Sequence, residues 1–127
     1  MDKVPGFRYL LSGDREWKTD PDGIRYVTFS TTPGDPASPL TVLSEIPANF
    51  REPPHKHGCN YTEIIIDGEM RVGKVDLSKG DVRVMQAGVG YGPLIAGPKG
   101  CTRLTIFDRA DGSPMILLGK EAAARHA

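Results

Sequence analysis

Short segments of β-branched and aromatic residues recur along the chain, separated by turns rich in glycine and proline. Such segments favour strands over helices, because branched and aromatic side chains fit a pleated surface. Only residues 120–125 have a helical pattern, and nothing supplies the crossover helices that a parallel sheet needs. The pattern therefore predicts an all-β fold of antiparallel strands, a sandwich or barrel with a short C-terminal helix. We predict strands at residues 7–11, 23–30, 40–46, 51–57, 61–67, 69–75, 81–86, 90–94, 101–108 and 115–118.

Length, charge and cysteine content narrow the class of protein. The 127 residues fit a single domain, residues 1–127, that can bury a core without a metal or a disulfide. Lys and Arg total 16, as do Asp and Glu, and no basic cluster marks a nucleic-acid binder. No apolar stretch reaches the length of a membrane span, and the first residues lack the apolar segment of a signal peptide, so we expect a cytoplasmic protein. Cys59 and Cys101 are too few for a disulfide framework, and we expect reduced thiols.

Two histidines one residue apart, in His55-Lys56-His57, give the clearest chemical signal. In a strand, residues i and i+2 point to the same face, so both imidazoles would point the same way, as metal ligands must. Glu63 follows six residues later, ahead of an apolar run and the turn pair Asp67-Gly68, which predicts a strand ending in a tight hairpin. We therefore expect two imidazoles and one carboxylate to converge. The plainer interpretation is a pair of surface histidines with an exposed Glu63.

With His55-Lys56-His57 and the closing Asp67-Gly68, residues 53–107 resemble the cupin superfamily, whose first motif contains His-x-His, a glutamate and a final glycine. Residues 79–91 fit the second cupin motif without a gap, and Gly80 and Gly88 stand at its glycine positions. The resemblance covers a little under half of the chain. It implies a small double-stranded β-helix, or jelly-roll barrel, with a metal ion inside.

Three positions depart from the cupin pattern. Counting back from Gly68, the family's glutamate position falls on Tyr61, while Glu63 lies two residues later on the same face of the strand. The position of the family's third histidine holds Tyr91, whose hydroxyl is a good hydrogen-bond donor and a rare ligand for divalent metals. Gln86 replaces a proline of the second motif, which affects turn rigidity more than chemistry. The full set of three histidines and one glutamate is therefore absent.

The metal ligands that remain are His55, His57 and Glu63, a set of two imidazoles and one carboxylate with open positions. Such a set suits non-heme Fe(II) and also accepts Mn, Ni or Zn, so we predict a divalent transition metal, with Fe(II) favoured. Glu63 can act as the third ligand or as a base. Cys59 can join the metal as a thiolate or be a buried, inert thiol.

The metal and the resemblance together predict a metal-dependent oxidoreductase of the dioxygenase type, acting on a carbonyl or enol group of a small organic molecule in the barrel. Glu63, Tyr61 or Tyr91 would move the proton as catalytic residues. Small cupins also include isomerases and cyclases, which gives one alternative. A non-catalytic metabolite-binding or sensor protein is another, which the lost histidine favours and the retained pair disfavours. We expect a homodimer, because small jelly rolls expose sheet edges that need covering.

Overall fold

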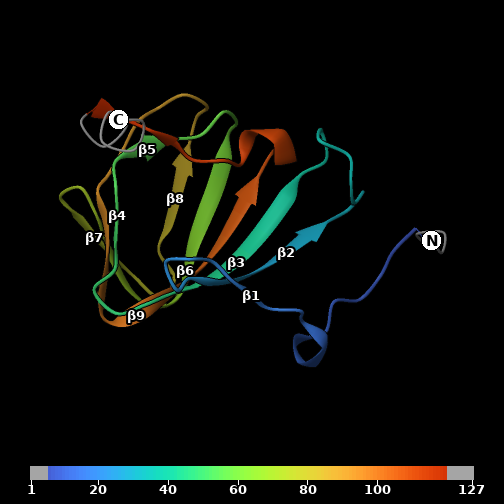
Figure 1. Ribbon diagram of the computed structural model, residues 1–127, viewed down its shortest axis with the longest axis horizontal. Coiled ribbons are helices and arrows are strands. Elements are labelled where there is room, and N and C mark those ends of the chain that lie inside the picture. Colours follow the sequence, from blue (N-terminus) through green and yellow to red (C-terminus); the bar gives the residue numbers. More distant parts are fainter. Residues whose placement is uncertain (1–5, 120–127) are drawn as a thin grey trace.

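The computed structural model describes residues 6–119. Figure 1 shows its strands curling into a barrel, with the N-terminal segment extending away from it. The elements are the 3₁₀ helix η1 (Ser12–Asp14), strands β1 (Lys18–Thr19), β2 (Arg25–Ser30), β3 (Leu40–Ile46), β4 (Arg51–Glu52), β5 (His55–Lys56), β6 (Tyr61–Val72), β7 (Val75–Ser78), β8 (Val82–Met85) and β9 (Leu94–Phe107), the 3₁₀ helix η2 (Ala110–Gly112), and strand β10 (Ile116–Leu117).

Antiparallel pairing joins most of these strands into one sheet, in the order β1-β2-β3-β9-β6-β7, with β4 on β9 and β8 on β6. The long strand β9 is central, because β6 follows it on one side while β3 and then β4 pair with it on the other. Strands β5 and β10 form a separate pair. The all-β jelly-roll prediction is confirmed, and the predicted helix at residues 120–125 lies outside the described residues.

The predicted hairpin at Asp67-Gly68 is wrong. Strand β6 continues through both residues, and its pairing with β9 shifts register on either side of them. Gly68 has φ +75°, and a methyl group in place of its hydrogen would overlap the carbonyl oxygen of Gly100. The glycine therefore allows a bulge and a close backbone approach rather than a turn. The turn comes at Gly73-Lys74, which joins β6 to β7, a strand that the sequence interpretation missed.

Prolines explain where other predicted strands fail. Residues 51–57 were expected to form one strand but form β4 and β5, because Pro53 and Pro54 between them have no N–H to donate. Residues 90–94 form only an isolated bridge at Tyr91, and β9 begins after Pro93. The predicted strand at residues 7–11 is also absent, for a reason other than proline: among the described residues, no neighbouring strand pairs with this segment.

Replacing Gly68 with alanine is expected to lower the free energy of unfolding by about 2–4 kcal/mol, since the left-handed backbone and the overlap with Gly100 both add cost. Gly34→Ala is the matched control, because Gly34 has φ +86° but no atom within 4 Å of the added methyl group. Its expected cost is only about 1–2 kcal/mol. Urea unfolding measures both. Equal losses in the two variants would show that the close approach does not matter.

The interior of the barrel has apolar ends and a polar middle. One buried cluster contains Ile46, Ile65, Met70, Leu94, Ala96 and Cys101, and another contains Cys59, Tyr61 and Phe107. Between them lie buried polar side chains, among them Glu52, Glu63 and Thr105. Buried polar groups need partners, so this middle layer is where specific chemistry is expected. Among residues 6–119, no helix has the length and apolar character that a membrane crossing requires.

The outer face of the sheet carries two uncharged rows of side chains. Cross-strand pairing aligns Val27, Leu43, Leu104, Ile64 and Val82 in one row, and Phe29, Thr41, Ile106, Thr62 and Val84 in the next. These positions alternate with residues that point inward. Exposure rises toward β8, where Val82 is 54% and Val84 is 73% exposed. An apolar sheet face of this kind is typical of an interaction surface.

Candidate functional site

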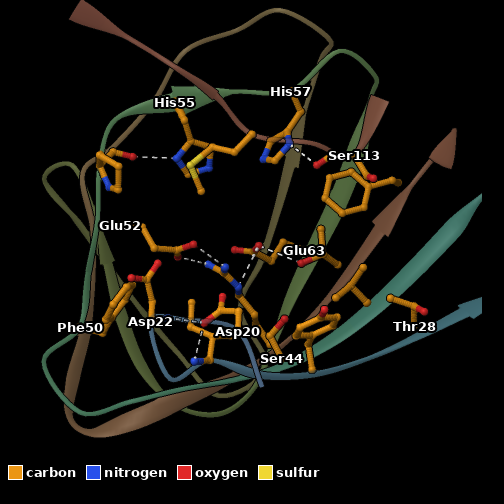
Figure 2. A pocket seen from close by; sticks show the side chains of 18 of the residues that line it. Asp20, Asp22, Thr28, Ser44, Phe50, Glu52, His55, His57, Glu63 and Ser113 are labelled. Carbon is orange, nitrogen blue, oxygen red and sulfur yellow. Dashed lines mark hydrogen bonds and ion pairs between the residues drawn. The ribbon is translucent and has the colours of Figure 1, made fainter. Parts of the chain in front are cut away.

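A cavity of about 510 Å³ lies inside the barrel, walled by β2, β3, β6 and β9 and by the segment that carries β4 and β5. Figure 2 shows His55 and His57 at one end of it and Asp20 at the other, with the carboxylates of Glu52 and Glu63 between them. Residues far apart in the sequence therefore share one pocket, and the two predicted histidines are at its wall.

The two histidines are held by the edge segment around β5. The backbone of His55 exchanges two hydrogen bonds of 3.0 Å with Tyr91, and β10 pairs with β5 on its other side. Both side chains are buried, with His55 3% and His57 8% exposed. Their ring centroids are 5.0 Å apart. The i, i+2 spacing thus brings the imidazoles together on one face.

Each imidazole is oriented by a backbone carbonyl. Nδ1 of His55 lies 2.7 Å from the carbonyl oxygen of Pro53, and Nδ1 of His57 lies 2.9 Å from that of Ser113. A carbonyl only accepts hydrogen bonds, so both Nδ1 atoms carry the proton. In the neutral rings, Nε2 therefore has a free lone pair. Metal-binding histidines are commonly held in this way, through a hydrogen bond on the nitrogen that does not bind the metal.

The Tyr91 hydroxyl lies between the two Nε2 atoms. Its oxygen is 2.7 Å from Nε2 of His55 and 3.1 Å from Nε2 of His57. The guanidinium of Arg83 lies over the Tyr91 ring, 4.2 Å from its centre. Burial raises the pKa of the Tyr91 hydroxyl, and the positive charge of Arg83 opposes that rise. Two imidazole nitrogens and one hydroxyl oxygen, all of which can bind a metal ion, therefore lie together at the pocket wall.

Burial favours the neutral form of both histidines. It lowers the pKa of His55, although the hydrogen bond to Pro53 acts in the opposite direction. Burial also lowers the pKa of His57, and the neighbouring His55 lowers it further. Both rings are therefore neutral at pH 7, the form that binds metal ions.

Glu63 is fully engaged by other side chains. Its Oε1 accepts hydrogen bonds from Nε and Nη2 of Arg83, at 3.2 and 3.0 Å, and its Oε2 accepts one from the Thr105 hydroxyl at 3.0 Å. Nε of Arg103 lies 3.7 Å from Oε2. Burial raises the pKa of Glu63, but Arg103 and Arg83 more than offset it and hold the pKa below its usual value. The carboxylate is therefore ionised and paired on both oxygens.

A second buried pair, which sequence reasoning missed, lies beside Glu63. Arg103 donates to both oxygens of Glu52, at 2.6 and 2.9 Å. The two residues are 51 positions apart in the sequence, and no local pattern links them. Arg83 and Arg103 are thus each paired with a glutamate of the chain itself.

Tyr61 and Cys59 lie beside the site rather than in it. The Tyr61 hydroxyl accepts a hydrogen bond from Arg83 at 3.2 Å, and burial raises its pKa strongly. Tyr61 and Glu63 do share a face, since both contact Arg83. The Cys59 thiol points to the carbonyl of Arg109 and packs in the cluster with Tyr61 and Phe107. Both cysteines are free thiols.

The donor atoms decide how well a metal ion fits. Among the described residues, no three His, Cys, Asp or Glu side chains form a group that could hold a metal, so His55, His57 and Glu63 do not assemble as one set. The two Nε2 atoms do fit, because each has a lone pair in the neutral ring and both lie within 3.1 Å of the Tyr91 oxygen. Two ligand atoms about 2.1 Å from a metal and at right angles lie about 3 Å apart. The distances of 2.7 and 3.1 Å to Tyr91 match that spacing.

Comparison with known proteins identifies the fold. No family model matches the sequence, and no curated protein does. Among solved structures, an RmlC-like cupin from Shewanella frigidimarina is similar, with a TM-score of 0.67 and 16% identity over 80% of this chain and 89% of that one. A proposed acetylacetone dioxygenase from Methylibium petroleiphilum has a TM-score of 0.67 and 18% identity over 99% of this chain and 97% of that one.

A third similar structure belongs to a regulatory complex. It is a chain from the complex of Rhodobacter sphaeroides SigE with the anti-sigma ChrR, with a TM-score of 0.63 and 20% identity over 76% of this chain. The present chain matches 51% of that chain, about half its length. These likenesses show that the chain has the cupin fold, as the motifs in residues 53–91 predicted.

Proposed function

We propose that this cupin-fold protein is an enzyme that holds one divalent transition metal, Fe(II) first, at His55 and His57 and acts on a small organic molecule in the pocket. The observation that carries the proposal is the pair of buried imidazoles, each oriented through Nδ1, whose Nε2 atoms converge at the pocket wall. When bound there, the metal would act as a Lewis acid toward a carbonyl or enol oxygen. The reaction class that fits best is a dioxygenase or related carbonyl chemistry.

The charges of the pocket favour an uncharged substrate. The four buried charged side chains cancel as two pairs, Glu52 with Arg103 and Glu63 with Arg83. A substrate carboxylate would have to displace a glutamate from one of these arginines, which leaves a buried charge unpaired. A neutral molecule with two oxygens, such as a 1,3-diketone, meets no such cost. The likeness to the proposed acetylacetone dioxygenase agrees with this choice.

The three residues predicted to be catalytic take different roles in this proposal. Tyr91 has its hydroxyl against both imidazoles, so it lies next to the metal and the reacting group of a bound substrate. Glu63 and Tyr61 both bind Arg83, and Arg83 in turn lies over the Tyr91 ring. We assign Glu63 and Tyr61 as positioning residues, which act on the site through Arg83.

A second candidate function is metabolite binding without turnover. The observation that favours it is that both buried glutamates of the pocket are occupied by arginines, so neither is available as a general base. The likeness to a chain of the SigE–ChrR complex is in keeping with a regulatory role. An isomerase or cyclase would need such a base more than a dioxygenase does.

Oxygen consumption by the Fe(II)-loaded protein with acetylacetone separates these functions. We expect uptake that needs both the metal and the diketone, and little uptake with malonate, the dicarboxylate with the same 1,3 arrangement of carbonyl carbons. A rise in unfolding temperature with the diketone but no oxygen uptake would favour the binding protein. If a panel of diketones and hydroxyketones gave neither oxygen uptake nor a shift in unfolding temperature, both functions would be contradicted.

We also propose that two copies associate through the uncharged rows on the outer face of the sheet. Val82 and Val84 are more than half exposed there, which costs free energy in water unless another surface covers them. Analytical ultracentrifugation is expected to give twice the chain mass for the wild type and one chain mass for Val84→Lys. A wild-type monomer at micromolar concentration would contradict the dimer.

A further inference from the structure

The hydrogen bonds around the two histidines leave one position unsatisfied. Both Nδ1 atoms donate to carbonyls, so both neutral rings present an Nε2 lone pair to the Tyr91 oxygen. The hydroxyl has one proton and can donate it to one nitrogen only. The other Nε2 then faces an oxygen lone pair at hydrogen-bond distance, with no proton between them. A cation bound between the two Nε2 atoms and the Tyr91 oxygen would satisfy all three of them.

We propose that the Tyr91 oxygen is the third protein ligand of the metal ion, completing a set of two imidazoles and one phenolate. On binding, the O–H bond of Tyr91 breaks, its proton goes to solvent, and the oxygen lone pair goes to the metal, with no change in oxidation state. The inference rests on the proposed metal site at His55 and His57. It replaces Glu63, the third ligand that the sequence suggested, with the residue at the position of the cupin family's third histidine.

The backbone fixes Tyr91 in place for this role. Its N–H and carbonyl pair with those of His55 across an isolated bridge, so the two ligand residues are direct cross-strand neighbours. The next residue, Gly92, has φ +112°, and its added methyl group would lie 3.0 Å from Cα of Pro54. A side chain at this position would push the Tyr91 segment away from the β5 segment. The site is therefore preformed, which favours metal binding.

The positive charge of Arg83 beside the Tyr91 ring would offset part of the cost of forming a phenolate at this buried position. The Arg83 guanidinium lies 4.2 Å from the ring centre, and its positive charge attracts the electron density of a phenolate. Glu63 holds that guanidinium with two hydrogen bonds. Glu63 would then support the metal site indirectly, through Arg83 and Tyr91. Two imidazoles and one phenolate leave open positions on a metal that prefers nitrogen and oxygen ligands, such as iron.

Loading the full chain with Fe(II), followed by oxidation to Fe(III), tests the inference by spectroscopy. A tyrosine oxygen bound to Fe(III) gives a visible charge-transfer band and resonance Raman modes of the phenolate ring. We expect both in the wild type and neither in Tyr91→Phe. Tyr91→Phe should also bind Fe(II) at least about tenfold more weakly, because losing a residue that only supports a metal ligand already lowers metal affinity by about 10–100-fold. Tyr9→Phe is the control, because Tyr9 is 80% exposed and does not line the pocket, and it should keep the band.

A second variant guards against misfolding of Tyr91→Phe. Tyr91→His places an imidazole at the same position and should restore Fe(II) affinity without the phenolate band. A band that survives in Tyr91→Phe, or metal bound by the wild type without any band, would overturn the tyrosine ligand while leaving the histidine site intact. A wild type that binds no iron would overturn the proposed metal function as well as this inference.

Discussion

Replacing Glu63 with glutamine is expected to lower the free energy of unfolding by about 3–5 kcal/mol, the usual cost of removing one partner from a buried ion pair. Glu63 is 4% exposed and binds Arg83 through two hydrogen bonds, with Arg103 close to its other oxygen. The neutral amide would leave the charge of Arg83 uncompensated inside the barrel. Urea denaturation monitored by the fluorescence of Trp17 would measure the loss.

Glu45→Gln is the matched control for Glu63→Gln. Glu45 pairs with Arg25 at 2.6 Å, but both side chains are largely exposed, so its loss should cost less than about 1 kcal/mol. The effect of Glu63 should also depend on pH. Because its pKa is lower in the folded protein than its usual value of 4.5, the stabilisation is complete above that value and is lost as the pH falls through the folded-state pKa. The wild type and Glu63→Gln should therefore converge in acid. Equal costs for the Glu63 and Glu45 variants would contradict the buried-pair account.

Replacing His57 with alanine is expected to weaken Fe(II) binding at least about 100-fold. Even the loss of a residue that only supports a metal ligand lowers metal affinity by about 10–100-fold, and His57 is itself a proposed ligand. His57 supplies one of the two Nε2 atoms that point to the Tyr91 oxygen, and the carbonyl of Ser113 fixes its ring. Alanine removes the donor and leaves a single imidazole. Competition against a coloured chelator under anaerobic conditions would measure the dissociation constant.

His126→Ala provides the control for the histidine variant, because it removes the chain's other histidine outside the described residues. We expect its affinity for Fe(II) to equal that of the wild type. Circular dichroism should show both variants folded. A His57→Ala protein that binds Fe(II) as tightly as the wild type would exclude the histidine pair as the metal site.

The strand pattern of the fold could be predicted from sequence wherever the signal is local. Residues 40–46 are rich in branched side chains, and the structure has β3 at the same seven positions. The bulge at Gly68 could not be predicted, because glycine is needed there for a close approach to the backbone of Gly100, 32 positions away in the sequence. A glycine that permits a close approach and a glycine that forms a turn look the same in the sequence.

In the site, too, local spacing could be predicted from the sequence, whereas contacts between distant residues could not. The spacing of His55 and His57 is enough to place both imidazoles on one face, and they do lie together. The partners of Glu63 are Arg83 and Thr105, 20 and 42 positions away, and nothing in the sequence near Glu63 reveals them. The sequence could place the Glu63 carboxylate on the correct face of the strand, but it could not show that Arg83 and Arg103 already bind this carboxylate.

Metal content of the untagged protein tests the central claim most directly. The chain would be incubated separately with Fe(II), Mn(II), Ni(II) and Zn(II), desalted and analysed by elemental mass spectrometry beside His57→Ala. The histidine site predicts close to one metal ion per chain for at least one of these ions, and almost none in the variant. No retained metal under any condition, or equal retention in His57→Ala, would contradict it.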